Sequence, residues 1–164
     1  MSQTPIKAVV ISISDTRRDE DDLSGTTLVG LLLSMKAQVV DKAIVSDEVE
    51  QIKEKLLEAA GQDGINLIVT TGGTGFSPRD NTPEATRAII EREAPGLAEA
   101  MRRETYSKTP LSMLSRAVCG IRGGVLIVNL PGSPKAVTEC FEVIRPILPH
   151  AIDLLTGKTS HHGG

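Results

Sequence analysis

The chain has 164 residues, of which 40% are hydrophobic and 24% charged, and its formal net charge is −3. This size and composition suit one folded domain with its own hydrophobic core. One Tyr, two Phe and no Trp are present, so the bases of a single-stranded nucleic acid would find few rings to stack on. Together with the negative net charge, this argues against nucleic-acid binding.

The amino-acid sequence shows neither a targeting signal nor a pair of closely spaced cysteines. No apolar run is long enough for a signal peptide or a membrane span, so we expect a soluble cytoplasmic protein without membrane contact. Cys119 and Cys140 are far apart and lack metal-ligand spacing, so we expect reduced, buried thiols. The polar tail, residues 157–164, is expected to be flexible.

Apolar, β-branched runs predict strands over residues 8–13, 39–45, 65–70 and 125–130. All but the second are nearly continuous rather than alternating, as in strands that are covered on both faces. Residues 118–121 are predicted to form a further strand at the edge of the sheet.

Helical spacing fills the intervals between these strands. Ser24, Ser46 and Thr82 (the last followed by Pro) are predicted to cap the first three helices. The predicted helices cover residues 25–35, 47–60, 84–92, 96–105, 135–147 and 149–156. Alternating strands and helices favour one domain over residues 1–164, an α/β fold built as a three-layer α/β/α sandwich with a mostly parallel sheet.

Polar loops follow three of the strands, at residues 12–25, 71–83 and 131–135. In a parallel α/β sheet, ligands bind beyond the carboxyl ends of the strands, where the strand order reverses. We therefore expect the three loops to converge on one ligand site.

The strongest motif is Thr70–Glu84, with the sequence TTGGTGFSPRDNTPE. Three glycines in four residues let the backbone turn sharply and approach an anion, and the next helix presents its N-terminus to it. Arg79 is expected to clamp phosphate, and Asp80 is a hard oxygen ligand of the kind Mg²⁺ prefers. The motif lacks the Lys of a Walker loop, and Pro78 replaces the third glycine of a dinucleotide fingerprint. The alternative is a plain glycine turn with an Arg79–Asp80 surface ion pair.

These segments resemble the signatures of the MogA/MoaB family of molybdenum cofactor biosynthesis proteins, to which the G domain of gephyrin belongs. The resemblance covers about residues 6–155. It rests on Thr70–Ala85, Asn129–Ala136, Ser46–Glu48, and Ile13–Arg17 with Asp22–Gly25.

The resemblance implies adenylylation of the molybdopterin phosphate by Mg-ATP, with release of pyrophosphate. Such a site must neutralise like charges and align the reacting groups, and it needs no general base because the nucleophile is already an anion. The resemblance implies that Asp47 and Asp80 are catalytic acids and ligands of Mg²⁺. It implies substrate-binding roles for Ser14, Asp15, Thr16, Thr71, Gly72, Gly73, Thr74, Gly75, Arg79, Pro131, Gly132, Ser133 and Lys135.

Assembly is also implied by the resemblance: a homotrimer, or in the MoaB branch a homohexamer, with the molybdenum-insertion protein as a further partner. The sequence is compatible with such an assembly, because apolar residues in the predicted helix 96–105 and in the segment after it are expected to be exposed. These residues are Leu97, Met101, Leu111, Met113 and Leu114.

Several alternatives stay open on the sequence. The chain could be a non-catalytic molybdopterin-binding or assembly protein of the MoaB branch, or a flavin or dinucleotide binder. Asp47 and Ser133 could serve only as helix N-terminal residues. Arg17 is expected in a solvated charged loop, and surface roles are expected for Arg116 and Arg122.

Overall fold

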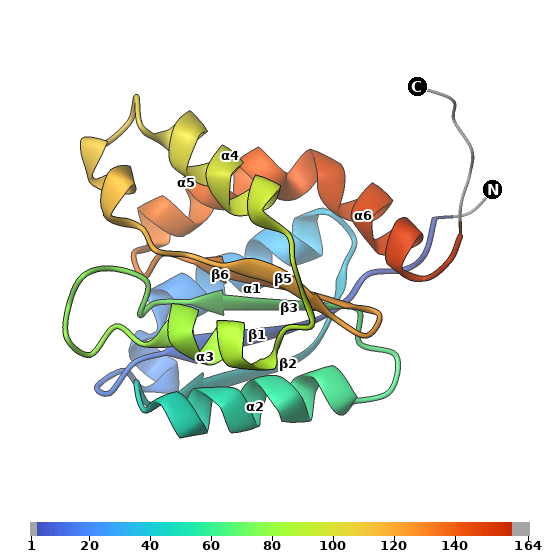
Figure 1. Cartoon of the computed structure of the whole chain (residues 1–164), viewed down its shortest axis with the longest axis horizontal. Helices are drawn as coiled ribbons and strands as arrows, with labels where there is room; N and C mark the ends of the chain where they lie inside the picture. Colours follow the sequence, from blue (N-terminus) through green and yellow to red (C-terminus); the bar gives the residue numbers. More distant parts are fainter. Residues whose placement is uncertain (1–2, 159–164) are drawn as a thin grey trace.

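The computed structural model describes residues 3–158. Within this range the backbone forms one six-stranded sheet in the order β2-β1-β3-β6-β5-β4 (Figure 1). Its strands are β1 (Lys7–Ile13), β2 (Gln38–Val45), β3 (Leu67–Thr71), β4 (Arg92–Glu93), β5 (Cys119–Arg122) and β6 (Val125–Leu130). The pairs β1–β2, β1–β3 and β3–β6 are parallel, whereas β5 pairs antiparallel with both β4 and β6. The mostly parallel α/β sandwich predicted from the sequence is confirmed.

Helices cover both faces of this sheet. They are α1 (Leu23–Ser34), α2 (Val49–Gly61), α3 (Thr82–Ile89), α4 (Pro95–Thr105), α5 (Pro134–Ile144) and α6 (Leu148–Leu155), with 3₁₀ turns η1 (Asp19–Asp21), η2 (Pro110–Leu114) and η3 (Arg145–Ile147). Figure 1 shows α2 and α3 on one side of the strands and α4, α5 and α6 on the other. None of the helices between residues 3 and 158 is both long and apolar enough to cross a membrane.

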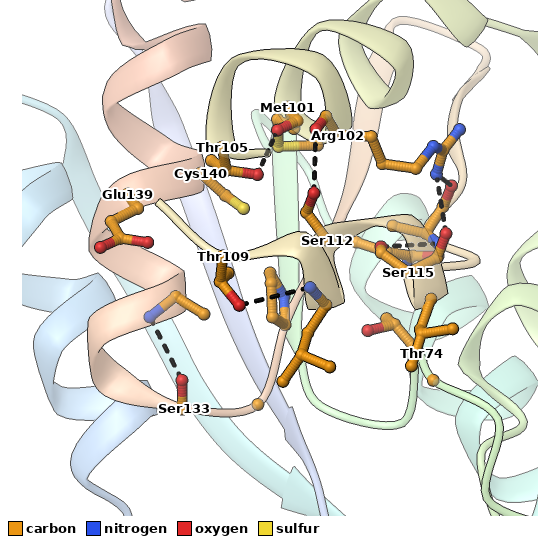
Figure 2. A pocket seen from close by; sticks show the side chains of 18 of the residues that line it. Thr74, Met101, Arg102, Thr105, Thr109, Ser112, Ser115, Ser133, Glu139 and Cys140 are labelled. Atoms are coloured by element: carbon orange, nitrogen blue, oxygen red, sulfur yellow. Dashed lines mark hydrogen bonds between the residues drawn. The ribbon is translucent and has the colours of Figure 1, made fainter. Parts of the chain in front are cut away.

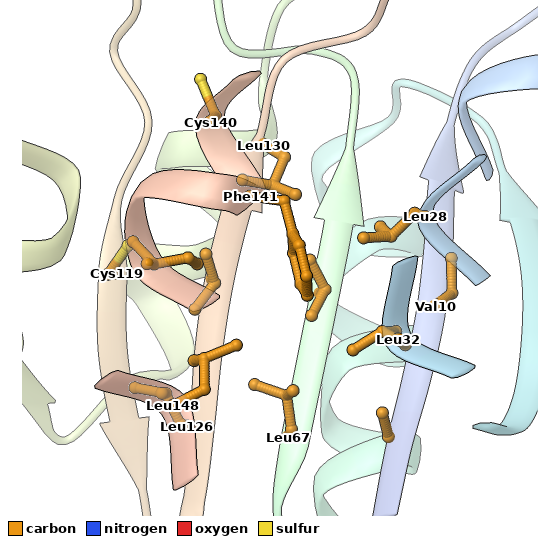
Figure 3. Close-up of a cluster of buried hydrophobic side chains, with 14 of the residues drawn as sticks. Val10, Leu28, Leu32, Leu67, Cys119, Leu126, Leu130, Cys140, Phe141 and Leu148 are labelled. Atoms are coloured by element: carbon orange, nitrogen blue, oxygen red, sulfur yellow. The ribbon is translucent and has the colours of Figure 1, made fainter. Parts of the chain in front are cut away.

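The core lies in two layers, one on each face of the sheet. Phe141 of α5 is fully buried and packs in the cluster that contains Leu28 and Leu32 of α1 and Leu67 of β3 (Figure 3). On the other face, Ile68 of β3 packs in the cluster formed with α2 and α3. Successive residues of the central strands are thus buried on opposite faces, which explains their continuous apolar runs.

The predicted caps of the first three helices are wrong. The helix α1 is capped by buried Asp22, whose carboxylate accepts a 3.2 Å hydrogen bond from Gly25 N, so Ser24 lies inside the helix. Helix α2 begins at Val49, after Ser46. Thr82 lies within α3, and its hydroxyl donates to Gly72 O at 2.9 Å instead of capping the helix. Ser24 and Thr82 have partners outside their own helices, whereas Ser46 bonds locally, donating to Gln51 Oε1 at 2.8 Å and accepting from Glu48 N at 3.3 Å.

Asp22 also anchors the first polar loop to the sheet. Its carboxylate accepts hydrogen bonds from Ser12 Oγ at 2.5 Å and from Lys42 Nζ at 2.9 Å. Burial alone would raise the pKa of Asp22, but the bonds from Ser12 and Lys42 lower it below its ordinary value of 3.8. The carboxylate is therefore held in its charged form inside the protein.

Other local predictions are also corrected by long-range pairing. The strand β5 is not an edge strand, because Arg92 and Glu93 pair with it and end the predicted helix 84–92 at Ile89. Met101 is buried and Leu97 is half-buried against the core, so the prediction that both are exposed is wrong. Both cysteines are buried and free, as predicted. The predicted flexible tail falls mostly on residues 159–164, outside the described range.

Candidate functional site

The three polar loops meet at the carboxyl ends of β1, β3 and β6, as predicted. Thr71 Oγ1 donates to Pro131 O at 2.6 Å, which joins the second loop to the third. Arg17 donates to Gly132 O at 2.8 Å and to Ser24 Oγ, so it joins the first loop to the third rather than lying free in solvent. These bonds between the loops fix their relative positions.

A cavity of about 620 Å³ opens beside the glycine loop (Figure 2). This volume is in the range of pockets that bind small molecules. Eight residues predicted to form the site line it: Gly73, Thr74, Gly75, Asp80, Pro131, Gly132, Ser133 and Lys135. Ser133 also caps α5, because its Oγ accepts from Ala136 N at 3.2 Å, so the predicted capping role holds.

The opposite wall of the cavity was not predicted from the sequence. It comes from α4, η2 and the segments between them, and Figure 2 shows several of its polar side chains. It carries Arg102, Thr105, Lys108, Thr109, Ser112 and Ser115. Hydroxyl residues at intervals of three or four are the sequence signal for this wall, in a segment whose apolar residues were predicted to be exposed.

The remaining predicted residues lie outside the cavity lining: Ser14, Asp15, Thr16, Asp47, Thr71, Gly72 and Arg79. Ser14 Oγ accepts hydrogen bonds from the backbone N–H groups of Thr16 and Arg17, which shapes the turn after β1. Gly72 has φ +99°, and a Cβ there would lie 2.6 Å from Ile13 O. Only glycine therefore fits at this position, where the second loop lies against the backbone at the end of β1.

Asp15, Asp47, Glu48 and Arg79 form an acidic cluster next to the loop. Asp15 N donates to Asp47 Oδ2 and Asp47 N donates to Asp15 Oδ1, each at 3.0 Å. Arg79 contacts both carboxylate oxygens of Asp15, with Nη2 2.8 Å from Oδ2, and its Nη1 lies 2.7 Å from Glu48 Oε1. Its partners are thus Asp15 and Glu48, not Asp80 as the surface-pair alternative requires.

The two central carboxyls of this cluster have opposite pKa shifts. The backbone hydrogen bond from Asp47 and the guanidinium of Arg79 lower the pKa of Asp15. Burial, followed by the charge of Asp15, raises the pKa of Asp47, and Asp80 adds to this effect. Asp47 precedes α2 instead of lying in its first turn, so the interpretation as a helix N-terminal residue is wrong.

In the glycine loop the carbonyl groups accept hydrogen bonds, whereas the N–H groups are free. The carbonyl oxygens of Gly73, Thr74 and Gly75 accept, in turn, from Thr82 N at 3.1 Å, Arg116 N at 2.7 Å and Arg116 Nε at 2.8 Å. Within residues 3–158, the N–H groups of these three residues have no hydrogen-bond acceptor. Consecutive free N–H groups form a concave site for an anion.

Residues 9–150 match the family model described as "Probable molybdopterin binding domain". The chain belongs to the MogA/MoaB family of molybdenum cofactor biosynthesis proteins. It is 38% identical over 153 residues to the molybdopterin adenylyltransferase of Helicobacter pylori (strain J99), covering 91% of this chain and 87% of that protein. It is 46% identical over 155 residues to the Drosophila melanogaster molybdenum cofactor synthesis protein cinnamon, covering 92% of this chain but only 26% of that protein.

Solved structures of the family share the fold. The molybdopterin biosynthesis enzyme MoaB from Thermus thermophilus has a TM-score of 0.86 at 44% identity, covering 93% of this chain and 98% of that one. The tungsten cofactor synthesizing protein MoaB from Pyrococcus furiosus has a TM-score of 0.82 at 30% identity, covering 96% and 100%. Proteins of molybdenum and of tungsten cofactor synthesis thus both occur among the relatives of this chain.

The carboxylates beside the glycine loop fit the Mg²⁺ that the family resemblance implies. A Cβ on Gly73 would lie 3.4 Å from Asp47 Oδ1, and a Cβ on Gly75 would lie 2.9 Å from Asp80 Oδ2, so both carboxylates flank the free N–H groups. Within residues 3–158, no group of three or more His, Cys, Asp or Glu side chains is placed to hold a metal alone. Mg²⁺ commonly takes one or two carboxylates and completes its shell with phosphate oxygens and water. Burial and, after it, the negative charges of Asp15 and Asp80 raise the pKa of Asp47, and a bound cation would offset those charges.

Arg116 contributes to the same loop, although a surface role was expected for it. Its side chain donates to Gly75 O and Asp80 O and pairs with Glu84. Arg122, by contrast, donates to Ile89 O at 2.7 Å, at the end of α3. Sequence spacing gave no signal for either contact, because the partners lie more than 30 positions away in the chain.

Proposed function

We propose that the chain transfers AMP from Mg-ATP to the phosphate of molybdopterin and releases pyrophosphate. A molybdopterin phosphate oxygen forms a bond to the α-phosphorus of ATP, and the bond from this phosphorus to the bridging oxygen of the β-phosphate breaks. The observation that carries the proposal is the set of three free N–H groups at Gly73, Thr74 and Gly75, with Asp80 beside them in the cavity lining and the Asp47 carboxylate next to Gly73. The 38% identity to a molybdopterin adenylyltransferase supports the same reaction.

Different residues of the site bind the phosphates, hold the metal ion and attract the second substrate. The free N–H groups bind phosphate oxygens. Thr82 and Arg116 hold the carbonyl groups of the same residues, so the loop does not have to rearrange when phosphate binds. Asp47 and Asp80 would hold Mg²⁺, which when bound neutralises negative charge on the phosphates. Lys135 lines the cavity with a largely exposed ammonium group that can attract the second anionic substrate.

The polar wall opposite the glycine loop suits the pterin. A pterin presents ring nitrogens, an amino group and a carbonyl group, which need donors and acceptors around a flat apolar slot. Thr105, Thr109, Ser112 and Ser115 bring hydroxyl groups to this wall, while Met101 and Ala98 supply apolar surface. The cavity is lined mainly by apolar surface with a few hydroxyl groups, which suits the face of a flat heterocyclic ring.

Arg79 does not serve as a free phosphate clamp in this arrangement. Its donors are engaged with Asp15 and Glu48, so a phosphate contact would require these carboxylates to be exchanged for phosphate oxygens. In the proposed reaction Arg79 keeps Asp15 charged and fixed, and Asp15 in turn fixes Asp47 through their paired backbone bonds.

Substitution of Asp80 separates an enzyme from a binding protein. Asp80→Asn keeps the size of the side chain but removes the charge that would hold Mg²⁺. We expect pyrophosphate release with purified molybdopterin to fall about 100-fold or more, the loss of about 2.7 kcal/mol of transition-state stabilisation. Molybdopterin affinity should change little. Exposed Asp63, in the turn before β3 and so at the opposite end of this strand from the glycine loop, offers the matched control Asp63→Asn.

Each result of this assay has a definite meaning. Wild-type turnover in Asp80→Asn would refute the catalytic role of Asp80. Molybdopterin binding without turnover in the wild type would favour the non-catalytic binding or assembly protein. Absence of both molybdopterin binding and turnover in a folded wild-type protein would refute the proposed function as a whole.

A further inference from the structure

Arg116 contacts the glycine loop at several points. Its backbone N–H donates to Thr74 O at 2.7 Å, and its guanidinium donates to Gly75 O at 2.8 Å and to Asp80 O at 2.7 Å. The same guanidinium pairs with Glu84 in the first turn of α3, and this contact lowers the pKa of the Glu84 carboxyl. One side chain thus spans the loop from its glycines to Asp80 and the helix behind it.

The loop has its own closure, but that closure does not reach Asp80. Thr82 bonds to the carbonyls of Gly72 and Gly73 and ties the two ends of the loop together. Asp80 is held locally by Ser77, through Asp80 N to Ser77 O at 2.9 Å and Ser77 N to Asp80 Oδ2 at 3.0 Å. The neighbours Arg79 and Asn81 tie this exposed turn to the side of Asp15 and Asp47. Arg116 is the residue that joins the backbone of Asp80 to that of Gly75.

The segment that carries Arg116 also belongs to the cavity wall. Arg102 of α4 donates to Ala117 O at 3.0 Å and to Ser115 O at 3.3 Å, on either side of Arg116 (Figure 2). Arg102 and Ser115 both line the cavity. Arg102, a residue of the cavity wall, therefore fixes the backbone on both sides of Arg116.

From these contacts we propose that Arg116 is a positioning residue, which fixes Asp80 against the glycine loop. The proposal rests on the role of Asp80 in the proposed function. Arginine is required because a planar guanidinium bridges two carbonyl oxygens and a carboxylate at once, whereas a Lys ammonium is a single compact charge on a flexible stem.

The test compares Arg116→Met and Arg116→Lys with the control Arg122→Met, which removes a single carbonyl contact at the far end of α3. Amide hydrogen exchange of Ser77 and Asp80, whose N–H groups are hydrogen-bonded in the loop tip, should rise about tenfold in Arg116→Met and remain unchanged in Arg122→Met. By calorimetry, Mg-ATP affinity should fall about tenfold while metal-free ATP affinity changes little, because Asp80 shifts but the free N–H groups remain. Turnover should fall about tenfold or more through kcat, and Arg116→Lys should not restore it.

The outcomes distinguish this proposal from the proposed function. Unchanged exchange in the loop of Arg116→Met would overturn the positioning role, as would full turnover in Arg116→Lys. An equal loss of metal-free and Mg-bound ATP affinity would mean that the loop collapsed as a whole, and it would also overturn the specific link to Asp80. If the wild type shows no turnover, the proposed function fails, and the exchange and calorimetry still decide the role of Arg116.

Discussion

Gly73 offers the sharpest test of the glycine loop, because its substitution by valine should abolish ligand binding while the domain stays folded. Gly73 has φ +68°, a left-handed conformation that a β-branched residue adopts only under strain. A Cβ at this position would lie less than 3.0 Å from Thr82 Oγ1 and 3.4 Å from Asp47 Oδ1. The added side chain would therefore collide with the hydroxyl that closes the loop.

The expected loss of stability follows from these two contacts. The strained conformation costs about 1–3 kcal/mol, and loss of the hydrogen bond from Thr82 to Gly72 O costs about 1 kcal/mol. A total of about 2–4 kcal/mol is below the stability of a typical domain, about 5–15 kcal/mol. The thermal midpoint should fall by about 5–15 °C without loss of the native fold.

Binding should suffer far more than stability in the Gly73→Val protein. The valine side chain occupies the space through which phosphate approaches the free N–H groups, so ATP affinity should fall about 100-fold or more, measured by titration calorimetry. Gly30 provides the matched control: it is an exposed helical residue of α1, and a Cβ there meets no atom within 4 Å. Gly30→Ala should raise the thermal midpoint, because alanine favours a helix by about 1 kcal/mol over glycine, and leave ATP affinity unchanged. A folded Gly73→Val protein with wild-type ATP affinity would refute the role of the loop.

Three further predictions concern stability, pH and assembly. Asp22→Asn should lower the free energy of unfolding by about 2–4 kcal/mol in denaturant titration, because it leaves Lys42 without its buried partner; a loss below about 0.5 kcal/mol would contradict this account. Since the folded pKa of Asp22 lies below its ordinary value of 3.8, its contribution is complete above that pH and disappears as the pH falls through the folded pKa. Thermal melts should therefore show a smaller acid loss in Asp22→Asn than in the wild type, and parallel curves would exclude Asp22 as the cause. For assembly, we expect trimers or paired trimers by light scattering, and the exposed side chains of Leu111 and Met113 are candidates for the contact. Leu111→Glu with Met113→Glu should give monomers, and a wild-type monomer at micromolar concentration would refute the prediction.

The sequence alone determined the layers of the fold and the position of the site. The apolar runs of β1, β3 and β6 record burial on both faces, a property that each residue carries wherever its neighbours are. Gly72 and Gly73 are also recognisable from the sequence, because their positive φ angles favour glycine at those positions. Parallel strand order then brings their loop to the loops after β1 and β6.

Only the tertiary structure decided which side chains meet at this site. Arg79 reaches Asp15 across 64 positions of sequence, and Arg116 reaches Asp80 across 36, so no periodicity contains either contact. The wall carrying Thr105 was hidden for the same reason, since the packing of α4 against α5 turns it toward the glycine loop. Local spacing reports how one element meets solvent or core, whereas a polar site depends on distances between elements, which the packing of side chains fixes only when the whole chain is folded.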